Sequence, residues 1–435
     1  RINKLMSLAE IHKKAKLVMI PSGFNSSSST DNLYSVIPSN SDGDFNYAGT
    51  TNGTRVNKDG LIEIASSNQP RLDYDPSNPQ NPHLLLEPSR TNLFKYYNDY
   101  SQSDWSKNNI TVTDNDITAP DGSLTGAKIL TTATTTATYL FQSVTETTGT
   151  DKYTFSIFVK KGDTDRVALR FQTNYPDRSD VVFVFSTASF ETQSTGGSIS
   201  VTSNKIVAYQ DDWFRIELTI QAVSGNSTVQ GYIRPRVTSG VVDATDTGTS
   251  FCYVWGGQME ESDVATSVIP TANNQVTRTA DSCNSAGNSN VFNSLEGVLF
   301  CEIAALSDDG TFRMLSISDG TNDNRVRINY TSSTEQLQGR LVTGGVTQAD
   351  IIKSSAGVTT FHKAALQYKA NEVKFFVDGT QVGSTDTSAS VPTVNTLDTL
   401  NFNGGSGTNV FFGKCKQLMY FDTILTDAEL TTLTT

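Results

Sequence analysis

Apolar and polar residues alternate in short runs along most of the chain. Between Asn98 and Ile269 these runs are KYTFSIFVKKG, RVALRFQT, VVFVFSTA, WFRIELTIQA, VQGYIRPRV and SFCYVWGGQME, and turns rich in Gly, Asn and Asp separate them. A period of two places successive side chains on opposite faces of a strand, and this many runs at regular spacing are typical of a β-sandwich or jelly roll. We therefore predict an antiparallel β-sandwich here.

A second series of alternating runs follows: GVLFCEIAAL, TFRMLSISDG, RVRINYTS, QLQGRLVTGG, FHKAALQYKA, EVKFFVDGTQVGST and VFFGKCKQLMYFD. In VKFFVDGTQVG two of the runs flank Asp378-Gly379, which is the strongest short hairpin signal that a sequence offers. Residues 290–435 are predicted to form a second antiparallel sandwich.

Helix signals are found near the two ends of the chain. Ser7 and Glu10 form a capping box at the start of SLAEIHKKAK, and Thr426 and Glu429 form another in LTDAELTTL. The expected fold class is therefore mainly β, with two short helices.

The first part of the chain is irregular. Short extended pieces alternate with turns up to Asp75, and repeated prolines between Asp73 and Phe94 exclude a helix. We place a boundary near residue 95 and predict three parts: an N-terminal region at 1–95, a sandwich at 96–275 and a second sandwich at 290–435. The stretch from Gly257 to Asp281 joins the two sandwiches, and we expect Glu260 and Glu261 at the polar rim of the first.

The net charge of −12 argues against nucleic-acid binding, which requires clustered Lys and Arg. No apolar run reaches the ~20 residues that span a membrane, and Pro21 interrupts AKLVMIPSGF, so we expect no membrane insertion and no signal peptide. The cysteines at positions 252, 283, 301 and 415 are far apart, which favours buried free thiols. The histidines at positions 12, 83 and 362 are expected to be structural.

Candidate catalytic acids do not form the pattern that a glycosidase on such a sandwich requires. Retaining enzymes place two carboxyl groups about 5 to 5.5 Å apart, which on one strand means acids two or four residues apart. In the second series Glu296 and Glu302 are isolated, and Asp308 and Asp309 belong to a turn. We predict no enzymatic activity and assign no catalytic residue.

Two acidic loops are candidates for calcium, which prefers oxygen ligands. The loop ISDGTNDNR offers Asp319, Asp323 and Asn324, and the loop SDDG offers Asp308 and Asp309. Because Asp and Asn also bond their own backbone in turns, we favour turn residues and assign no metal ligand.

Sugar rings stack on exposed aromatic side chains, but few aromatic residues fit that role here. Trp105, Trp213 and Trp255 fall within or beside strand patterns and are expected in the core, whereas Tyr175 and Tyr330 lie near loops or strand ends. The glycan-binding residues therefore stay unassigned.

The second series resembles the laminin G or concanavalin A-like lectin family. The hairpin from Val373 to Val382 with its FVDG, and the closing LMYFDTILTDAEL, carry the resemblance over about residues 290–435. It implies a lectin-type jelly roll at the C-terminus.

The first 281 residues resemble virion fibre and appendage proteins of tailed bacteriophages. The motifs IPSGF, LYSVIPSNSDGDFNY, TRVNKDGLIE, PRLDYD and LLLEPSRTNLF occur in order, and WGGQMEESDVATSVIPT…VTRTAD closes the middle sandwich, whereas FNYAGTTNGTRVN departs from the family's usual pattern. The resemblance implies attachment to a head or tail through the N-terminus, carbohydrate-binding-module-like sandwiches displayed outward, and a homo-oligomer, most often a trimer.

We therefore expect a structural virion appendage, made in the cytoplasm of the bacterial host, that docks to other virion proteins and binds host-surface glycans. The locally basic N-terminus indicates Lys13, Lys14 and Lys16 as docking residues, although a solvated helix face explains the same charges. The shortness of the chain favours the head or collar over a long tail fibre. A capsule depolymerase with an accessory lectin module and a purely architectural decoration protein are the alternatives.

Overall fold

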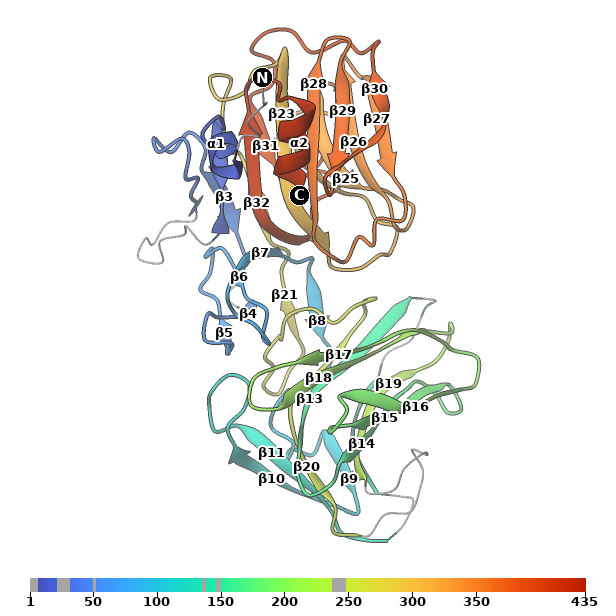
Figure 1. The fold of residues 1–435 in the computed structure, drawn as a ribbon. Coiled ribbons are helices and arrows are strands. Elements are labelled where there is room, and N and C mark those ends of the chain that lie inside the picture. The colour runs from blue at the N-terminus through green and yellow to red at the C-terminus, as the bar shows by residue number, and fades with distance from the viewer. Residues whose placement is uncertain are drawn as a thin grey trace.

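Two β-sandwiches form the two lobes of the molecule, one above the other in Figure 1. The computed structural model describes residues 7–21, 32–49, 52–134, 138–145, 149, 151–236 and 248–435. In the described part of the chain, strands account for 49% of the residues, and there are two short helices. The predicted mainly β fold class is confirmed.

The middle sandwich consists of two six-stranded antiparallel sheets. In spatial order, one sheet contains β10 (Ile110–Ile117), β11 (Gly126–Thr131), β20 (Phe251–Glu260), β13 (Lys152–Lys161), β18 (Trp213–Gln221) and β17 (Ser200–Ala208). The other contains β16 (Ser189–Gly196), β15 (Arg178–Val184), β14 (Arg166–Gln172), β19 (Thr228–Arg236), β12 (Tyr139–Thr145) and β9 (Trp105–Asn108). Alternate residues of these strands, among them Phe155, Leu169 and Ile233, fill the space between the sheets.

The C-terminal sandwich pairs an eight-stranded sheet with a five-stranded one. The larger sheet has the order β30 (Thr380–Asp386), β29 (Val373–Val377), β28 (His362–Lys369), β23 (Glu296–Ala305), β32 (Gly413–Phe421), β7 (His83–Leu86) and β6 (Leu72–Asp73), and β1 (Leu17–Met19) also pairs with β32. The smaller sheet has the order β27 (Val346–Lys353), β26 (Leu337–Thr343), β25 (Arg325–Tyr330), β24 (Arg313–Ser318) and β31 (Thr399–Asn401).

The predicted hairpin between β29 and β30 is present. Asp378 and Gly379 both have positive φ, at 49° and 77°, as a two-residue type I′ turn requires. The pairing of Val377 with Thr380 fixes the register of the two strands.

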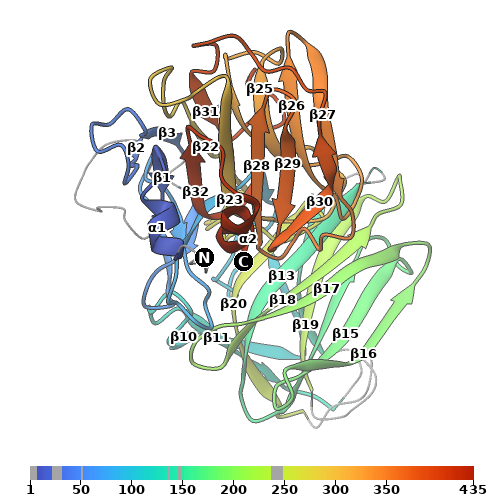
Figure 2. The same cartoon turned by 45° about the horizontal axis from the view of Figure 1, so that its top comes forward.

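Both predicted helices form, and both cover the outer face of the larger sheet (Figure 2). α1 (Leu8–His12) begins at the Ser7–Glu10 capping box, and α2 (Asp427–Thr434) begins at the Thr426–Glu429 box. Ile11 and Leu430 lie in one apolar cluster with residues of the sheet, so the two ends of the chain pack together.

The N-terminal region is divided between the two sandwiches. β1, β6 and β7 extend the larger C-terminal sheet, whereas the hairpin of β4 (Thr54–Val56) and β5 (Ile62–Ile64) packs on the outer face of the middle sandwich. Two small sheets complete the junction: β2 (Asn32–Leu33), β3 (Phe45–Ala48) and β22 (Ser282–Asn284) form one, and β8 (Arg90–Asn92) with β21 (Val276–Arg278) forms the other. The predicted domain limits stay a prediction, and the structure adds that residues before 95 bridge both sandwiches.

Candidate functional site

A cleft of about 510 Å³ lies between the two sandwiches. Side chains from the N-terminal region, the middle sandwich, the segment 264–268 and the C-terminal sandwich all line it. Known pockets for small ligands occur preferentially at such domain boundaries and fall in this range of volume. We therefore take this cleft as the candidate functional site.

One wall of the cleft belongs to the C-terminal sandwich and the strands added to it. Lys414 and Lys416 face the cleft because they alternate along β32 with the buried Cys415. Nζ of Lys416 lies 4.0 Å from the ring centroid of Phe361, a cation–π distance. This wall thus combines an aromatic ring with two ammonium groups.

His83 lies in the same wall, and burial lowers its pKa. Its Nε2 lies 3.2 Å from Oδ2 of Asp73, the residue opposite it in the β6–β7 pair. The edge of the His83 ring faces Phe361 at 5.7 Å between centroids. The imidazole is therefore neutral at pH 7, and the expectation that it is structural fits these contacts.

The opposite wall comes from β17 and β18 of the middle sandwich. Lys205 and Glu217 face each other across the two strands, with Nζ and Oε1 3.6 Å apart. Beside them Arg215 is buried and donates hydrogen bonds to the carbonyl of Thr266 and to Oγ of Ser156. Arg215 thereby fixes segment 264–268 against the wall.

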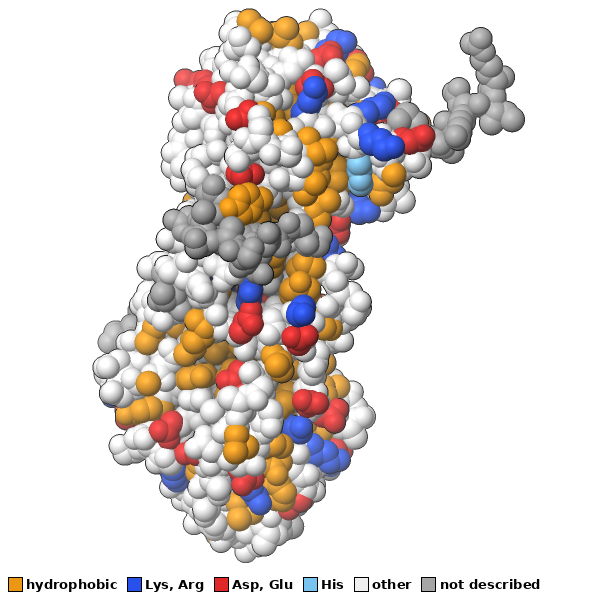
Figure 3. All heavy atoms as spheres, turned by 90° about the vertical axis from the view of Figure 1, so that its left-hand side faces the viewer, with side chains coloured by type: hydrophobic (Ala, Val, Ile, Leu, Met, Phe, Trp, Pro, Cys, Tyr) orange, Lys and Arg blue, Asp and Glu red, His pale blue; other side chains and the backbone are white. Residues whose placement is uncertain are grey.

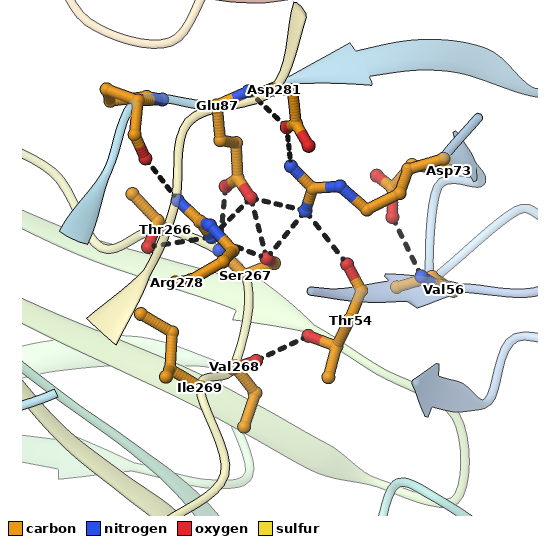
Figure 4. A network of polar contacts seen from close by, with 12 residues as sticks. Thr54, Val56, Asp73, Glu87, Thr266, Ser267, Val268, Ile269, Arg278 and Asp281 are labelled. Carbon is orange, nitrogen blue, oxygen red and sulfur yellow. Dashed lines mark hydrogen bonds and ion pairs between the residues drawn. The ribbon is translucent and has the colours of Figure 1, made fainter. Parts of the chain in front are cut away.

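Glu87 lines the cleft and belongs to a buried ion network, shown in Figure 4. Oε2 of Glu87 accepts from Nη1 of Arg71 and from Nη1 of Arg278, each at 2.6 Å, and Asp281 forms an ion pair with Nη2 of Arg71. Ser267 donates its backbone N–H and its hydroxyl to Glu87. The four charged side chains are at most 3% exposed, so each charge has a partner where water is excluded.

Electrostatics hold this network in its ionised form. Burial alone would raise the pKa of the Glu87 carboxyl, but Arg278 and Arg71 outweigh burial and lower the pKa to about 2. Burial also raises the pKa of Tyr47, which donates its hydroxyl to Asp281 at 2.8 Å. At neutral pH the network is therefore a charged joint between the N-terminal region and the segment before the C-terminal sandwich.

Two predicted docking lysines contact the C-terminal part of the same chain. Nζ of Lys14 lies 2.5 Å from Oε1 of Glu429, and Nζ of Lys16 lies 3.4 Å from Oδ2 of Asp422. Lys13 is exposed and caps the end of α1 through its backbone. The docking role of the three lysines stays a prediction.

The aromatic candidates separate clearly. Tyr330 is 2% exposed and stacks on Phe411 inside the C-terminal core, so its ring is not available to a sugar. Tyr175 is 73% exposed, with the guanidinium carbon of Arg178 5.3 Å from its ring centroid. The sequence pattern did not separate the two tyrosines because both lie near strand ends.

The three tryptophans are buried, as expected, but in different places. Trp105 belongs to the core between the two sheets of the middle sandwich. Trp213 and Trp255 lie on its outer face, under the β4–β5 hairpin. They therefore anchor the N-terminal region to the middle sandwich.

The interpretation of Glu260 as a rim residue is wrong. Its side chain is fully buried, and Oε1 accepts from the hydroxyl of Thr266 at 2.5 Å while Oε2 accepts from Nε2 of Gln258 at 2.7 Å. Burial raises the pKa of this carboxyl. The segment that follows β20 folds back over the strand and covers Glu260, which a local pattern cannot reveal; Glu261, by contrast, is exposed.

Asp319 and Asp309, two of the acids that were considered for calcium, accept hydrogen bonds from residues close to them in sequence. Oδ1 of Asp319 accepts from the backbone N–H and the hydroxyl of Thr321, and Oδ2 accepts from Nδ2 of Asn324. Asp309 accepts from Nη2 of Arg313 at 2.6 Å. Among the described residues no group of three or more His, Cys, Asp or Glu side chains is arranged to hold a metal ion.

One face of the molecule is covered mostly by backbone and by side chains that are neither charged nor hydrophobic, with small separate groups of charged and hydrophobic side chains (Figure 3). In the part of the chain that the structure describes, no helix is long and apolar enough to cross a membrane.

Comparison with known families places the C-terminal sandwich. Residues 301–431, within the C-terminal sandwich, match the model of the concanavalin A-like lectin/glucanases superfamily, so this sandwich is similar to laminin G and concanavalin A-like domains. A comparison with curated protein sequences gives no match.

Among solved structures, domains LG4-5 of the mouse laminin alpha1 chain are similar at 8% identity with a TM-score of 0.22, over 65% of this chain and 84% of that one. A Trypanosoma rangeli sialidase is similar at 10% identity with a TM-score of 0.27, over 71% of this chain and 60% of the sialidase. A glycosidic hydrolase is similar at 12% identity with a TM-score of 0.24, over 34% of this chain and 73% of the hydrolase.

Proposed function

We propose that the chain is a virion appendage of a tailed bacteriophage that docks through its N-terminal region and binds host-surface glycans. In this proposal the glycan occupies the cleft between the two sandwiches. The appendage acts at the virion surface as a homo-oligomer, with a trimer favoured by the sequence resemblance.

The observation that carries glycan binding is the cleft beside a lectin-like domain. Its volume of about 510 Å³ suits a short oligosaccharide. Phe361 supplies an aromatic ring, and Lys414, Lys416 and Lys205 supply donors around it. Apolar rings combined with a few placed polar groups are the usual means of fixing a sugar.

The virion role is supported by the motifs that resemble phage appendages. PRLDYD contains Arg71, LLLEPSRTNLF contains Glu87, and VTRTAD contains Arg278 and Asp281, so these motifs supply the buried ion network to which Glu87 belongs. Their physical task is to hold the N-terminal region and the two sandwiches in one arrangement. A protein attached to a particle needs such a joint to hold its displayed sandwiches in a fixed position relative to its anchored N-terminal region.

We propose binding without catalysis. A general acid in a glycosidase requires a raised pKa. Of the cleft carboxyls with a shifted pKa, Glu87 has a value of about 2, and hydrogen bonds from Ser77 lower the pKa of Asp75 against the effect of burial. Neither group is suited to protonate a leaving oxygen at neutral pH.

A glycan array probed with the full chain tests the binding proposal, with Phe361→Ala as the cleft variant and Tyr175→Ala as a matched aromatic control. Loss of the array signal in the first variant alone supports the cleft. An array without hits contradicts glycan binding and favours a purely architectural role, whereas release of reducing ends from host polysaccharide would establish the depolymerase.

Docking is tested separately by imaging of whole particles with labelled protein. We expect the label on the head or collar. Lys13→Glu should weaken attachment while Lys58→Glu, an exposed change on the β4–β5 hairpin, leaves it intact. Equal attachment of both variants would remove Lys13 from the docking surface.

A further inference from the structure

Three carboxylates that line the cleft have close partners within the protein, whereas the lysines of the cleft do not. Oδ1 of Asp73 accepts the backbone N–H of Val56 at 2.7 Å, while its Oδ2 faces His83. Oδ1 of Asp75 accepts the backbone N–H of Ser77 at 2.8 Å and its hydroxyl at 2.6 Å. The charge of Glu87 is neutralised by Arg71 and Arg278. These carboxylates therefore have little capacity left for a ligand.

The lysines of the cleft have weaker partners. Within the described part of the chain the ammonium group of Lys414 has no hydrogen bond or ion pair, although it lies near Asp75 and His83. Among the described residues, Lys416 forms an ion pair with Glu302, at 3.5 Å, and Lys205 forms one with Glu217, at 3.6 Å. Both distances exceed those of good charge-assisted hydrogen bonds, which are about 2.7–2.9 Å. The cleft thus offers donors without matching acceptors.

The positions of these lysines define the shape of the complementary ligand. Lys414 and Lys416 are two residues apart on one strand, which separates their Cα atoms by about 7 Å on the same face. Phe361 lies directly under the ammonium group of Lys416. Lys205 stands on the opposite wall. A sugar ring that lies near Phe361 would bring a ring substituent to the lysines.

We propose that the cleft binds an anionic saccharide, whose carboxylate or phosphate is held by Lys414 and Lys416 and whose ring lies at Phe361. This inference rests on the proposed glycan-binding function of the cleft. The net charge of −12 disfavours anions elsewhere on the chain, but screening limits that repulsion to about 8 Å at physiological salt, so the local lysines decide the outcome.

The test measures binding of three tetrasaccharides to the full chain by calorimetry: tetragalacturonate, its carboxyl-reduced form, and a phosphate ester of that reduced form. We expect an anionic form to bind at least tenfold more tightly than the neutral form, with an affinity that falls as salt rises. Preference between the uronate and the phosphate ester identifies the anion. Equal binding of all three would overturn the inference.

Variants separate this inference from the function on which it rests. The double variant Lys414→Ala with Lys416→Ala should bind the anionic ligand at least tenfold more weakly and the neutral ligand with unchanged affinity. Lys353→Ala, on the other sheet of the same sandwich, should change neither affinity. Thermal melting of each variant shows whether it is folded. If the neutral form binds and the lysine changes have no effect, only the anionic preference fails. If none of the three binds, and the array has no hits, the glycan-binding function fails.

Discussion

Oε2 of Glu87 lies 2.6 Å from Nη1 of Arg278, and this bond joins the N-terminal region to the segment between the two sandwiches. Neither side chain is more than 3% exposed. A buried charge pair of this kind stabilises little compared with well-packed apolar residues, but loss of one partner leaves the other charged and dehydrated. A substitution of one partner should therefore destabilise the folded chain more than replacement of both partners by apolar residues would.

Glu87→Ala should destabilise the chain by about 3–5 kcal/mol, because Arg71 and Arg278 would both lose their shared partner. Urea unfolding followed by tryptophan fluorescence measures the change, and Trp213 and Trp255 report on the nearby outer face. The control is Lys161→Ala, which breaks a partly exposed pair with Asp165 and should cost less than about 1 kcal/mol. Equal effects of the two variants would refute a critical role for the joint.

The pH dependence of stability should contain a contribution from Glu87. Its pKa of about 2 in the folded chain is below the ordinary value of 4.5. A depressed carboxyl pKa contributes stability above the unfolded pKa, and that stability is lost as pH falls from about 4.5 towards about 2. Melting temperatures of the native chain and of Glu87→Gln should therefore converge over this interval. A constant difference between them would contradict the lowered pKa.

The sequence predicts the features of this structure that depend on neighbouring residues, and it does not predict those that depend on residues far apart in the chain. The alternating runs predicted both sandwiches, and the Asp378-Gly379 turn predicted its hairpin, because each signal lies within about ten residues of sequence. The pairing of Val18 with Met419 could not be predicted, since a strand of three residues specifies no register.

The cleft was also beyond the reach of local patterns. Asp73, Lys205 and Lys416 come together only when the two sandwiches are placed, and none has a distinctive local motif. The burial of Glu260 has the same cause, because its partner Thr266 lies beyond the end of the strand. The motifs PRLDYD, LLLEPSRTNLF and VTRTAD contain the residues of the buried ion network, whereas the resemblance to phage appendages stays a prediction.

Two substitutions at the contact between Lys14 and Glu429 should destabilise the chain by different amounts. Lys14→Ala removes one partly exposed ion pair and should cost less than about 1 kcal/mol. Glu429→Ala removes that pair and also the capping box of α2, so it should cost about 1–2 kcal/mol. Thermal melting of the two variants measures the order. Equal losses for the two variants would show that the helix cap adds nothing beyond the ion pair.

The four cysteines provide a separate probe of each sandwich. All four are free and buried, and burial raises the pKa of each thiol, so the reactive thiolate is scarce in the native chain. Cys252 belongs to the core of the middle sandwich, and the other three belong to the core of the C-terminal one. We expect almost no reaction with a thiol reagent in buffer and complete reaction in strong denaturant. Peptide mapping at intermediate urea concentrations should show Cys252 labelled at the urea concentration where the middle sandwich unfolds. The other three cysteines should be labelled at the concentration where the C-terminal sandwich unfolds. Rapid labelling of any of the four in buffer would mean that its core opens under native conditions.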